Sequence, residues 1–93
     1  MIASFACNET ERIWQRGFSR RLDHSIQAVA LRKLRMLNHA RRLEDLAAFP
    51  GSRLEPLKGD RIGQWSIRIN DQWRICFRWR NSDAHGVEIV DYH

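Results

Sequence analysis

Residues 63–80 read GQWSIRINDQWRICFRWR, and this stretch decides the fold. Large apolar side chains occupy every second position on both sides of the Asn70-Asp71 pair, and serine, cysteine or arginine fills most positions between them. Alternation with a period of two over this length predicts two β-strands. Each strand is expected to be apolar on one face and polar, mainly arginine, on the other.

The same pattern fixes the register of the predicted hairpin. Directly opposed residues of an antiparallel pair share a face. A two-residue turn would set Arg68 opposite Trp73 and mix the faces, whereas a three-residue loop (70–72) sets Ile69 opposite Trp73. We therefore predict the longer loop or a bulge. This register also sets Arg68 opposite Arg74, an unfavourable pair of like charges that must either turn into solvent or hold an anion between them.

Two short elements are predicted near the N-terminus. Residues 2–6 are mostly apolar and are expected to form a first strand. Residues 11–16 are predicted to form a short helix that is capped by Asn8 or Thr10 and ends at Gly17.

The clearest helix covers residues 26–38, where apolar side chains recur at the i, i+3 and i+4 positions of one stripe. Asp23 or Ser25 is expected to cap it. A further short helix is predicted at 42–48, and the Phe-Pro-Gly sequence that follows it is a strong stop signal.

A loop at 51–62 is expected to be anchored to the core by Leu54 and Leu57. After the hairpin, 81–85 is predicted as a turn and 86–92 as a last strand. We thus expect one α+β domain over residues 1–93, with the order β-α-α-β-β-β and a mainly antiparallel twisted sheet packed on the N-terminal helices.

The chain is basic, and arginine supplies most of the positive charge. The formal net charge is +5, with 14 arginines against 2 lysines. A guanidinium group is planar, always charged and able to bind phosphate oxygens in pairs. This composition favours a polyanionic partner, with nucleic acid as the first candidate.

Several other classes of protein are disfavoured by the sequence. It contains no apolar run of the roughly 20 residues needed to span a bilayer, and no secretory signal is visible. The four histidines and the two cysteines, Cys7 and Cys76, show no metal-ligand or disulfide spacing. We expect a reduced, cytoplasmic protein without metal or cofactor.

The segments LEPLKGDRIGQWSIRINDQWRICFRW at 54–79 and VEIVDYH at 87–93 resemble the HigB branch of the RelE-like toxins of bacterial toxin–antitoxin pairs. The resemblance implies the RelE-like fold and a ribosome-dependent endoribonuclease that cuts mRNA in the decoding site of the 70S ribosome. It also implies neutralisation by a helix-turn-helix antitoxin whose complex with the toxin binds operator DNA.

Carried over residue by residue, the resemblance implies the catalytic set Lys58, Arg74, Asp91, Tyr92 and His93. One position departs from the pattern, because some relatives carry histidine where this chain has Glu55. If that histidine transfers a proton in those relatives, either Glu55 replaces it here or the role moves to His93.

The chemistry of RNA cleavage without metal fits such a set. A base removes the proton of the 2′-hydroxyl, an acid protonates the leaving 5′-oxygen, and cations stabilise the charge that grows on the phosphoryl oxygens. Lys58 and Arg74 suit the charge role, and histidine has a pKa suited to either proton role. Tyr92 could stack on a base or donate a proton. Acid and base are not assigned uniquely by the sequence.

Further arginines are candidates for contacts with RNA. Arg68 and Arg78 are candidate phosphate ligands, although a solvent-facing charge is the simpler interpretation of Arg78. The candidates for contact with the ribosome are Arg20, Arg21, Arg32, Lys33 and Arg35. The four tryptophans are interpreted as core residues rather than a base-stacking platform, because those of the hairpin share a face.

Two alternatives remain open beside the mRNA-cleaving toxin. One is a non-catalytic module of the same fold that only binds RNA or the antitoxin. The other is a ribosome-independent nuclease, which the lack of a clear pair of histidines disfavours.

Overall fold

The computed structural model describes residues 1–91, in which the α-helices occupy the first half and the strands, with one short 3-10 helix, the second. The helices are α1 (Asn8–Arg16), α2 (His24–His39), α3 (Leu43–Ala47) and the short 3-10 helix η1 (Gly59–Arg61). The strands are β1 (Glu55–Pro56), β2 (Trp65–Arg68), β3 (Trp73–Arg80) and β4 (Asp83–Asp91). They form one four-stranded sheet in the order β1-β2-β3-β4, and all its neighbouring strands are antiparallel. The predicted α+β class is confirmed.

The β2–β3 hairpin has the predicted register. Arg68 pairs with Arg74, and the amide of Ile69 donates a hydrogen bond of 2.9 Å to the carbonyl of Trp73. This bond closes the predicted three-residue loop (70–72), which is held by the side-chain oxygen of Asn70 through hydrogen bonds accepted from the amides of Gln72 and Trp73. The alternation of side chains was therefore sufficient to place the two strands correctly.

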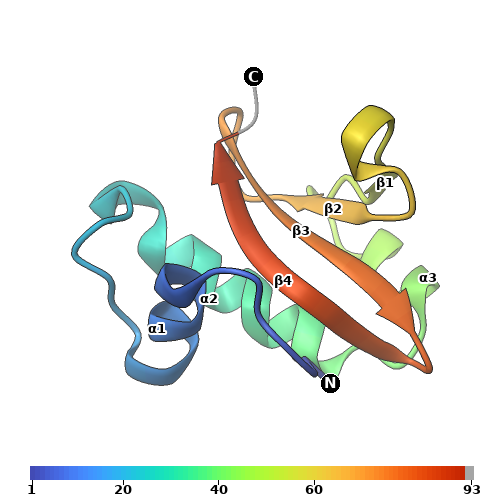
Figure 1. Ribbon diagram of the computed structural model, residues 1–93, viewed down its shortest axis with the longest axis horizontal. Coiled ribbons are helices and arrows are strands. Elements are labelled where there is room, and N and C mark those ends of the chain that lie inside the picture. The colour runs from blue at the N-terminus through green and yellow to red at the C-terminus, as the bar shows by residue number, and fades with distance from the viewer. Residues whose placement is uncertain (92–93) are drawn as a thin grey trace.

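The core lies between the sheet and the helices, with α1 and α2 on one face of the sheet (Figure 1). Ile67, Ile75 and Phe77 of the sheet are fully buried there, and Ala30 and Leu34 of α2 are fully buried against them. The predicted stripe of α2 thus faces the sheet. Asp23 caps α2 by accepting a hydrogen bond from the amide of Ser25, as predicted.

The N-terminal strand expected at 2–6 is wrong in detail. Residues Ile2 and Phe5 make only isolated parallel bridges, to Ala84 and Val87 of β4. Gly86 lies between these partners with a φ of +60°, and its amide donates to the hydroxyl of Ser4 rather than to a backbone carbonyl. A left-handed residue interrupts the regular ladder there, so the segment runs beside β4 without forming a strand.

Two predicted element ends are also corrected. The N-cap of α1 is Cys7 rather than Asn8 or Thr10, because the Thr10 hydroxyl is buried and accepts a hydrogen bond from the amide of Ile89. The final strand begins at Asp83 because the turn is confined to residues 81 and 82, both with positive φ. Such a tight turn is the normal connection of a hairpin.

The loop expected at 51–62 contains β1 and η1, which the sequence did not predict. β1 adds a two-residue edge strand to β2, and Leu57 is buried as an anchor, as predicted. None of the helices in residues 1–91 has the length and apolar character required to cross a bilayer.

Candidate functional site

The face of the sheet opposite α1 and α2 carries the polar side chains of the hairpin; we call it the open face. Residues paired across neighbouring strands point to the same face, and two such rows cross the sheet. The first row consists of Glu55, Ser66, Cys76 and Glu88. The second row consists of Arg68, Arg74 and Val90. Charged side chains thus flank a centre made of Ser66 and Cys76, both fully buried.

Arg74 is held in a fixed position on this face. Its Nη2 donates a hydrogen bond of 2.6 Å to Oε1 of Glu55, and its Nη1 donates a bond of 3.0 Å to the hydroxyl of Ser66. A third, longer contact of 3.4 Å runs to the carbonyl of Arg53. Only 11% of the Arg74 side chain is exposed. A guanidinium that is oriented in advance can stabilise charge without first reorganising.

Arg68 binds a different carboxylate. Its Nη2 donates to Oδ1 of Asp71 in the hairpin loop, and this bond lowers the pKa of Asp71. Arg74, opposite it, instead binds Glu55 on β1. The like charges that the register places side by side are therefore each neutralised by a carboxylate of the chain. The sequence did not predict these two carboxylate partners.

The segment 57–64 folds over the open face and reaches β4. Nη1 of Arg61 donates to Oε1 of Glu88 at 2.7 Å and to the side-chain oxygen of Gln64 at 3.0 Å. The hydrogen bond to Glu88 raises the pKa of Arg61, so this cation stays charged. Gly63 has a φ of +90° and lies so close to Arg78 that a Cβ would come within 2.9 Å of the guanidinium. Glycine thus permits the close approach.

We predict that Glu88→Gln will loosen this segment while leaving the fold intact. The Arg61–Glu88 pair is partly exposed, so its loss should lower the free energy of unfolding by only about 1 kcal/mol or less. The amide of Leu57, which donates to the carbonyl of Gln64 at 2.9 Å, should exchange its hydrogen faster. Hydrogen exchange followed by mass spectrometry measures this change.

The matched control is Glu44→Gln, because Glu44 forms an exposed ion pair of 3.9 Å with Arg42 in another part of the chain. Equal exchange at Leu57 in both variants and in the unaltered protein would contradict the prediction.

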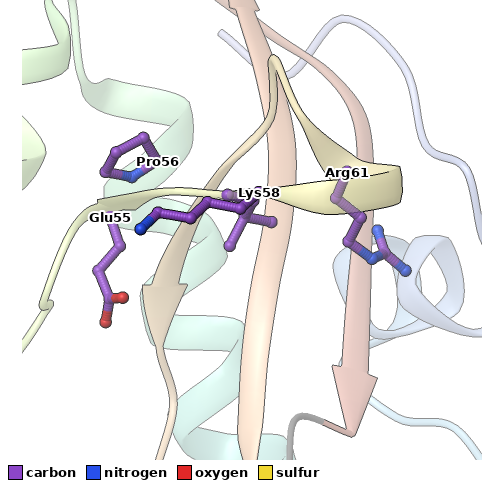
Figure 2. A pocket seen from close by; sticks show the side chains of 5 residues that line it. Glu55, Pro56, Lys58 and Arg61 are labelled. Carbon is purple, nitrogen blue, oxygen red and sulfur yellow. The ribbon is translucent and has the colours of Figure 1, made fainter.

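A pocket of about 310 Å³ opens beside Glu55 (Figure 2), the carboxylate that binds Arg74. Its lining consists of Glu55, Pro56, Leu57, Lys58 and Arg61. Lys58 is exposed and precedes η1, and in Figure 2 its side chain extends toward Glu55 and Pro56. The pocket therefore combines two cations with one carboxylate, and the guanidinium of Arg74 is hydrogen-bonded to that carboxylate.

The structure describes one member of the predicted C-terminal catalytic triplet. Asp91 ends β4, pairs with Trp73 and accepts a hydrogen bond of 3.1 Å from the side-chain amide of Gln72. Tyr92 and His93 lie outside the described residues. Within the described part of the site, Glu55 and Lys58 line one pocket and Arg74 binds Glu55. Asp91 lies at the same end of the sheet, but it pairs with Trp73 and therefore shares the face of the core rather than the open face of Arg74.

The remaining predicted RNA ligands differ in their surroundings. Arg78 is exposed on β3 beside Gly63, as a solvent-facing charge would be. Among the candidates for ribosome contact, Lys33 is intermediate in burial and the other four are exposed: Arg20, Arg21, Arg32 and Arg35. Burial lowers the pKa of Lys33, and the charges of Arg32 and Arg68 lower it further.

Two residues of the site were missed by the sequence analysis. Arg61 had no strand or helix pattern to place it, although its spacing of three from Lys58 matches one turn of the 3-10 helix η1. Glu88 is an ordinary alternating residue of the last strand, and only the folding of 57–64 over the sheet brings it to Arg61.

Cys76 lies beneath this surface. Burial raises the pKa of its thiol and Glu88 adds to the effect, while Arg61 and Arg74 oppose it. The thiol is therefore protonated at neutral pH and is a poor nucleophile. In residues 1–91 no three side chains of His, Cys, Asp or Glu are arranged to hold a metal ion.

Comparison with known proteins assigns the family. A family model described as "RelE-like toxin of type II toxin-antitoxin system HigB" matches residues 3–93. The chain belongs to the HigB-like toxin family. This confirms the resemblance noted in the sequence.

Two curated proteins are similar to this HigB-like toxin. The Proteus vulgaris protein named "Endoribonuclease HigB" is 51% identical over 41 residues, which cover 44% of this chain and 45% of that protein. The alignment thus spans less than half of that relative. The Vibrio cholerae serotype O1 protein named "Toxin HigB-1" is 42% identical over 73 residues, which cover 78% of this chain and 73% of that protein.

Two solved structures share the fold of the HigB-like toxin. A YoeB/ParE toxin from Agrobacterium tumefaciens superposes with a TM-score of 0.52 at 22% identity, covering 96% of this chain and 91% of the other. A chain of the YoeB-YefM complex from Staphylococcus aureus gives a TM-score of 0.56 at 15% identity, covering 100% and 98%. The RelE-like architecture predicted from the sequence is thereby confirmed.

Proposed function

We propose that this HigB-like toxin is an endoribonuclease that cuts mRNA on the ribosome and thereby stops translation. The observation that carries the proposal is the pair of hydrogen bonds from Arg74 to Glu55 and Ser66. They fix a guanidinium beside a pocket that is lined by Lys58, Arg61 and Glu55. A phosphate in this pocket would meet cations on two sides. The name of the Proteus vulgaris relative, an endoribonuclease, supports the same class of reaction.

The proposed reaction is attack by the 2′-hydroxyl on the adjacent phosphorus. The proton of that hydroxyl passes to a base of the site, the 2′-oxygen bonds to phosphorus, and the bond to the 5′-oxygen breaks as an acid protonates it. The products are a 2′,3′-cyclic phosphate and a 5′-hydroxyl. Arg74 and Lys58 stabilise the charge on the phosphoryl oxygens.

The proton carriers in this scheme are drawn from Glu55 and the C-terminal residues Asp91, Tyr92 and His93. Glu55 lines the pocket and holds an oxygen 2.6 Å from the guanidinium of Arg74. A carboxylate there can accept a proton next to the phosphate. His93 has the intrinsic pKa best suited to exchange protons near neutral pH.

The partners follow from the same proposal. The substrate is mRNA in the decoding site of the 70S ribosome, with the exposed Arg20 and Arg21 among the contacts to ribosomal RNA. The inhibitor is a helix-turn-helix antitoxin of the same module, and the complex of the two would bind operator DNA in the cytoplasm. The solved YoeB-YefM complex, in which a chain of this fold is bound to a partner, supports a protein partner of this kind.

Cleavage of a defined mRNA on programmed ribosomes tests the proposal, with naked mRNA beside it. We expect cleavage only on ribosomes, reduced by about 10²- to 10⁴-fold in His93→Ala, because that is the usual contribution of a general acid or base.

Each other result has a definite meaning. Cleavage that survives His93→Ala would move the proton transfer to Glu55, Asp91 or Tyr92. Cleavage of naked mRNA at the same rate would identify a ribosome-independent nuclease. No cleavage, with binding to ribosomes or antitoxin retained, would show a non-catalytic module.

A further inference from the structure

A groove of about 580 Å³ lies between α2 and α3, away from the Arg74 pocket. On α2 its lining residues follow the 3.6-residue period of one helix face. The full lining is Arg32, Arg35, Met36, His39, Ala40, Asp45, Ala48 and Phe49. Its volume falls within the range of about 300–1,000 Å³ that is usual for binding pockets.

The floor of this groove is apolar. Met36, Ala40 and Ala48 line it beside the ring of Phe49, which keeps 50% of its surface exposed. Leaving a large aromatic side chain in water forgoes the favourable free energy of its burial. A partner with apolar side chains would recover that free energy by covering the ring.

The rim of the groove is positive. Arg32, Arg35 and His39 of α2 lie along it, and Arg35 is exposed. The single carboxylate of the lining, Asp45, accepts hydrogen bonds of 3.0 Å from the amides of Arg41 and Arg42. These two bonds lower the pKa of Asp45, whose carboxylate belongs to the capping box of α3. The groove therefore complements a negatively charged partner.

Two other kinds of occupant fit less well. RNA would bring its phosphates to the rim and could stack a base on Phe49, but the aliphatic part of the floor, Met36, Ala40 and Ala48, would gain no apolar partner. A second copy of this chain would be repelled, because it would bring its own arginines toward the arginines of the rim and each copy carries a net charge of +5.

We propose that this groove binds an acidic amphipathic segment of the antitoxin of the same toxin–antitoxin module. Helices and short segments with apolar anchors commonly dock in this way. The inference rests on the proposed function, because it takes the antitoxin as the inhibitor. Occupation of the groove also neutralises Arg32 and Arg35, two candidates for contact with the ribosome, so antitoxin binding would oppose ribosome binding.

The test is titration calorimetry of the purified, full-length toxin with the purified antitoxin of its module. Phe49→Asp places a negative charge in the floor and should weaken binding by about tenfold or more, as expected for a buried aromatic anchor. The matched control is Phe18→Asp, because Phe18 is also exposed, by 47%, but lies outside the groove. The control should bind like the unaltered toxin.

Arg35→Glu tests the charge of the rim independently of the floor. It should weaken antitoxin binding, whereas Arg80→Glu, at an exposed arginine of β3 outside the groove, should not. Both arginines are exposed, so neither variant should alter thermal unfolding.

The outcomes separate this inference from the proposed function. If the unaltered toxin binds the antitoxin but Phe49→Asp and Arg35→Glu bind it equally well, the groove is not the docking site. If Phe49→Asp loses sedimentation with ribosomes and keeps its affinity for the antitoxin, the surface belongs to RNA and the inference is overturned. If the unaltered toxin does not bind the antitoxin, the proposed partner itself is wrong, and the inference is overturned with it.

Discussion

Replacing Arg74 by alanine is expected to reduce cleavage of mRNA on ribosomes by about 10²- to 10³-fold, the usual cost of removing one fixed donor to a developing negative charge. The reason is geometric. Glu55 and Ser66 already hold the guanidinium in place beside the pocket, so its contribution requires no rearrangement during the reaction. The loss should appear in kcat measured at saturating concentrations of programmed ribosomes.

A conservative variant separates charge from geometry. Arg74→Lys keeps the positive charge but cannot reproduce the two hydrogen bonds that the guanidinium makes to Glu55 and Ser66. We expect it to recover only part of the lost activity. The matched control is Arg80→Ala, which removes the same charge from an exposed position of the same strand.

Thermal unfolding must be measured beside activity, because the variant could lose cleavage simply by losing stability. Only 11% of the Arg74 side chain is exposed, and its removal leaves Glu55 without this partner. If folded Arg74→Ala cleaves as fast as the unaltered protein while Arg80→Ala is impaired, the site has been assigned to the wrong residues.

The sequence predicted those parts of the fold that depend on periodicity. The β2–β3 hairpin and its register followed from one face of alternating Trp, Ile and Phe, because a slip of one residue would expose that whole face. The opposition of Arg68 and Arg74 followed from the same register. Helix α2 was equally predictable, because its buried stripe repeats over enough turns to show the period of a helix.

Short or irregular elements were not predictable in this way. β1 has two residues, Glu55 and Pro56, and so carries no period. Its pairing with β2 nevertheless puts Glu55 within reach of Arg74. The N-terminal segment looked like a strand because it is apolar, but Gly86 interrupts the ladder that it would have joined.

The candidate site was predictable in its residue types rather than its contacts. The resemblance to HigB-like toxins supplied Lys58, Arg74 and Asp91, whereas nothing in the sequence linked Arg61 to Glu88, which are 27 positions apart. The carboxylates that neutralise the arginines were also missed. A contact between distant segments follows from packing of the whole chain, and local pattern does not report it.

Replacing Phe77 by alanine is expected to lower the free energy of unfolding by about 3–5 kcal/mol, the usual cost of removing a fully buried aromatic ring and leaving a cavity. Phe77 is 0% exposed, belongs to the core between sheet and helices, and contacts Trp79 edge-to-face with ring centroids 6.4 Å apart. A domain of this size has a total stability of about 5–15 kcal/mol. Urea denaturation measures the change, with Phe77→Leu as a milder control that fills most of the cavity.

Phe77→Ala and Arg74→Ala should lose activity for different reasons, because Phe77 holds in place the strand from which Arg74 and Arg78 project. Phe77→Ala should lose cleavage and stability together, and its activity should return at lower temperature as the folded population rises. Arg74→Ala should lose cleavage at every temperature at which it is folded. If Phe77→Ala instead lowers the unfolding free energy by less than about 1 kcal/mol, the packing at the centre of β3 is looser than its complete burial implies.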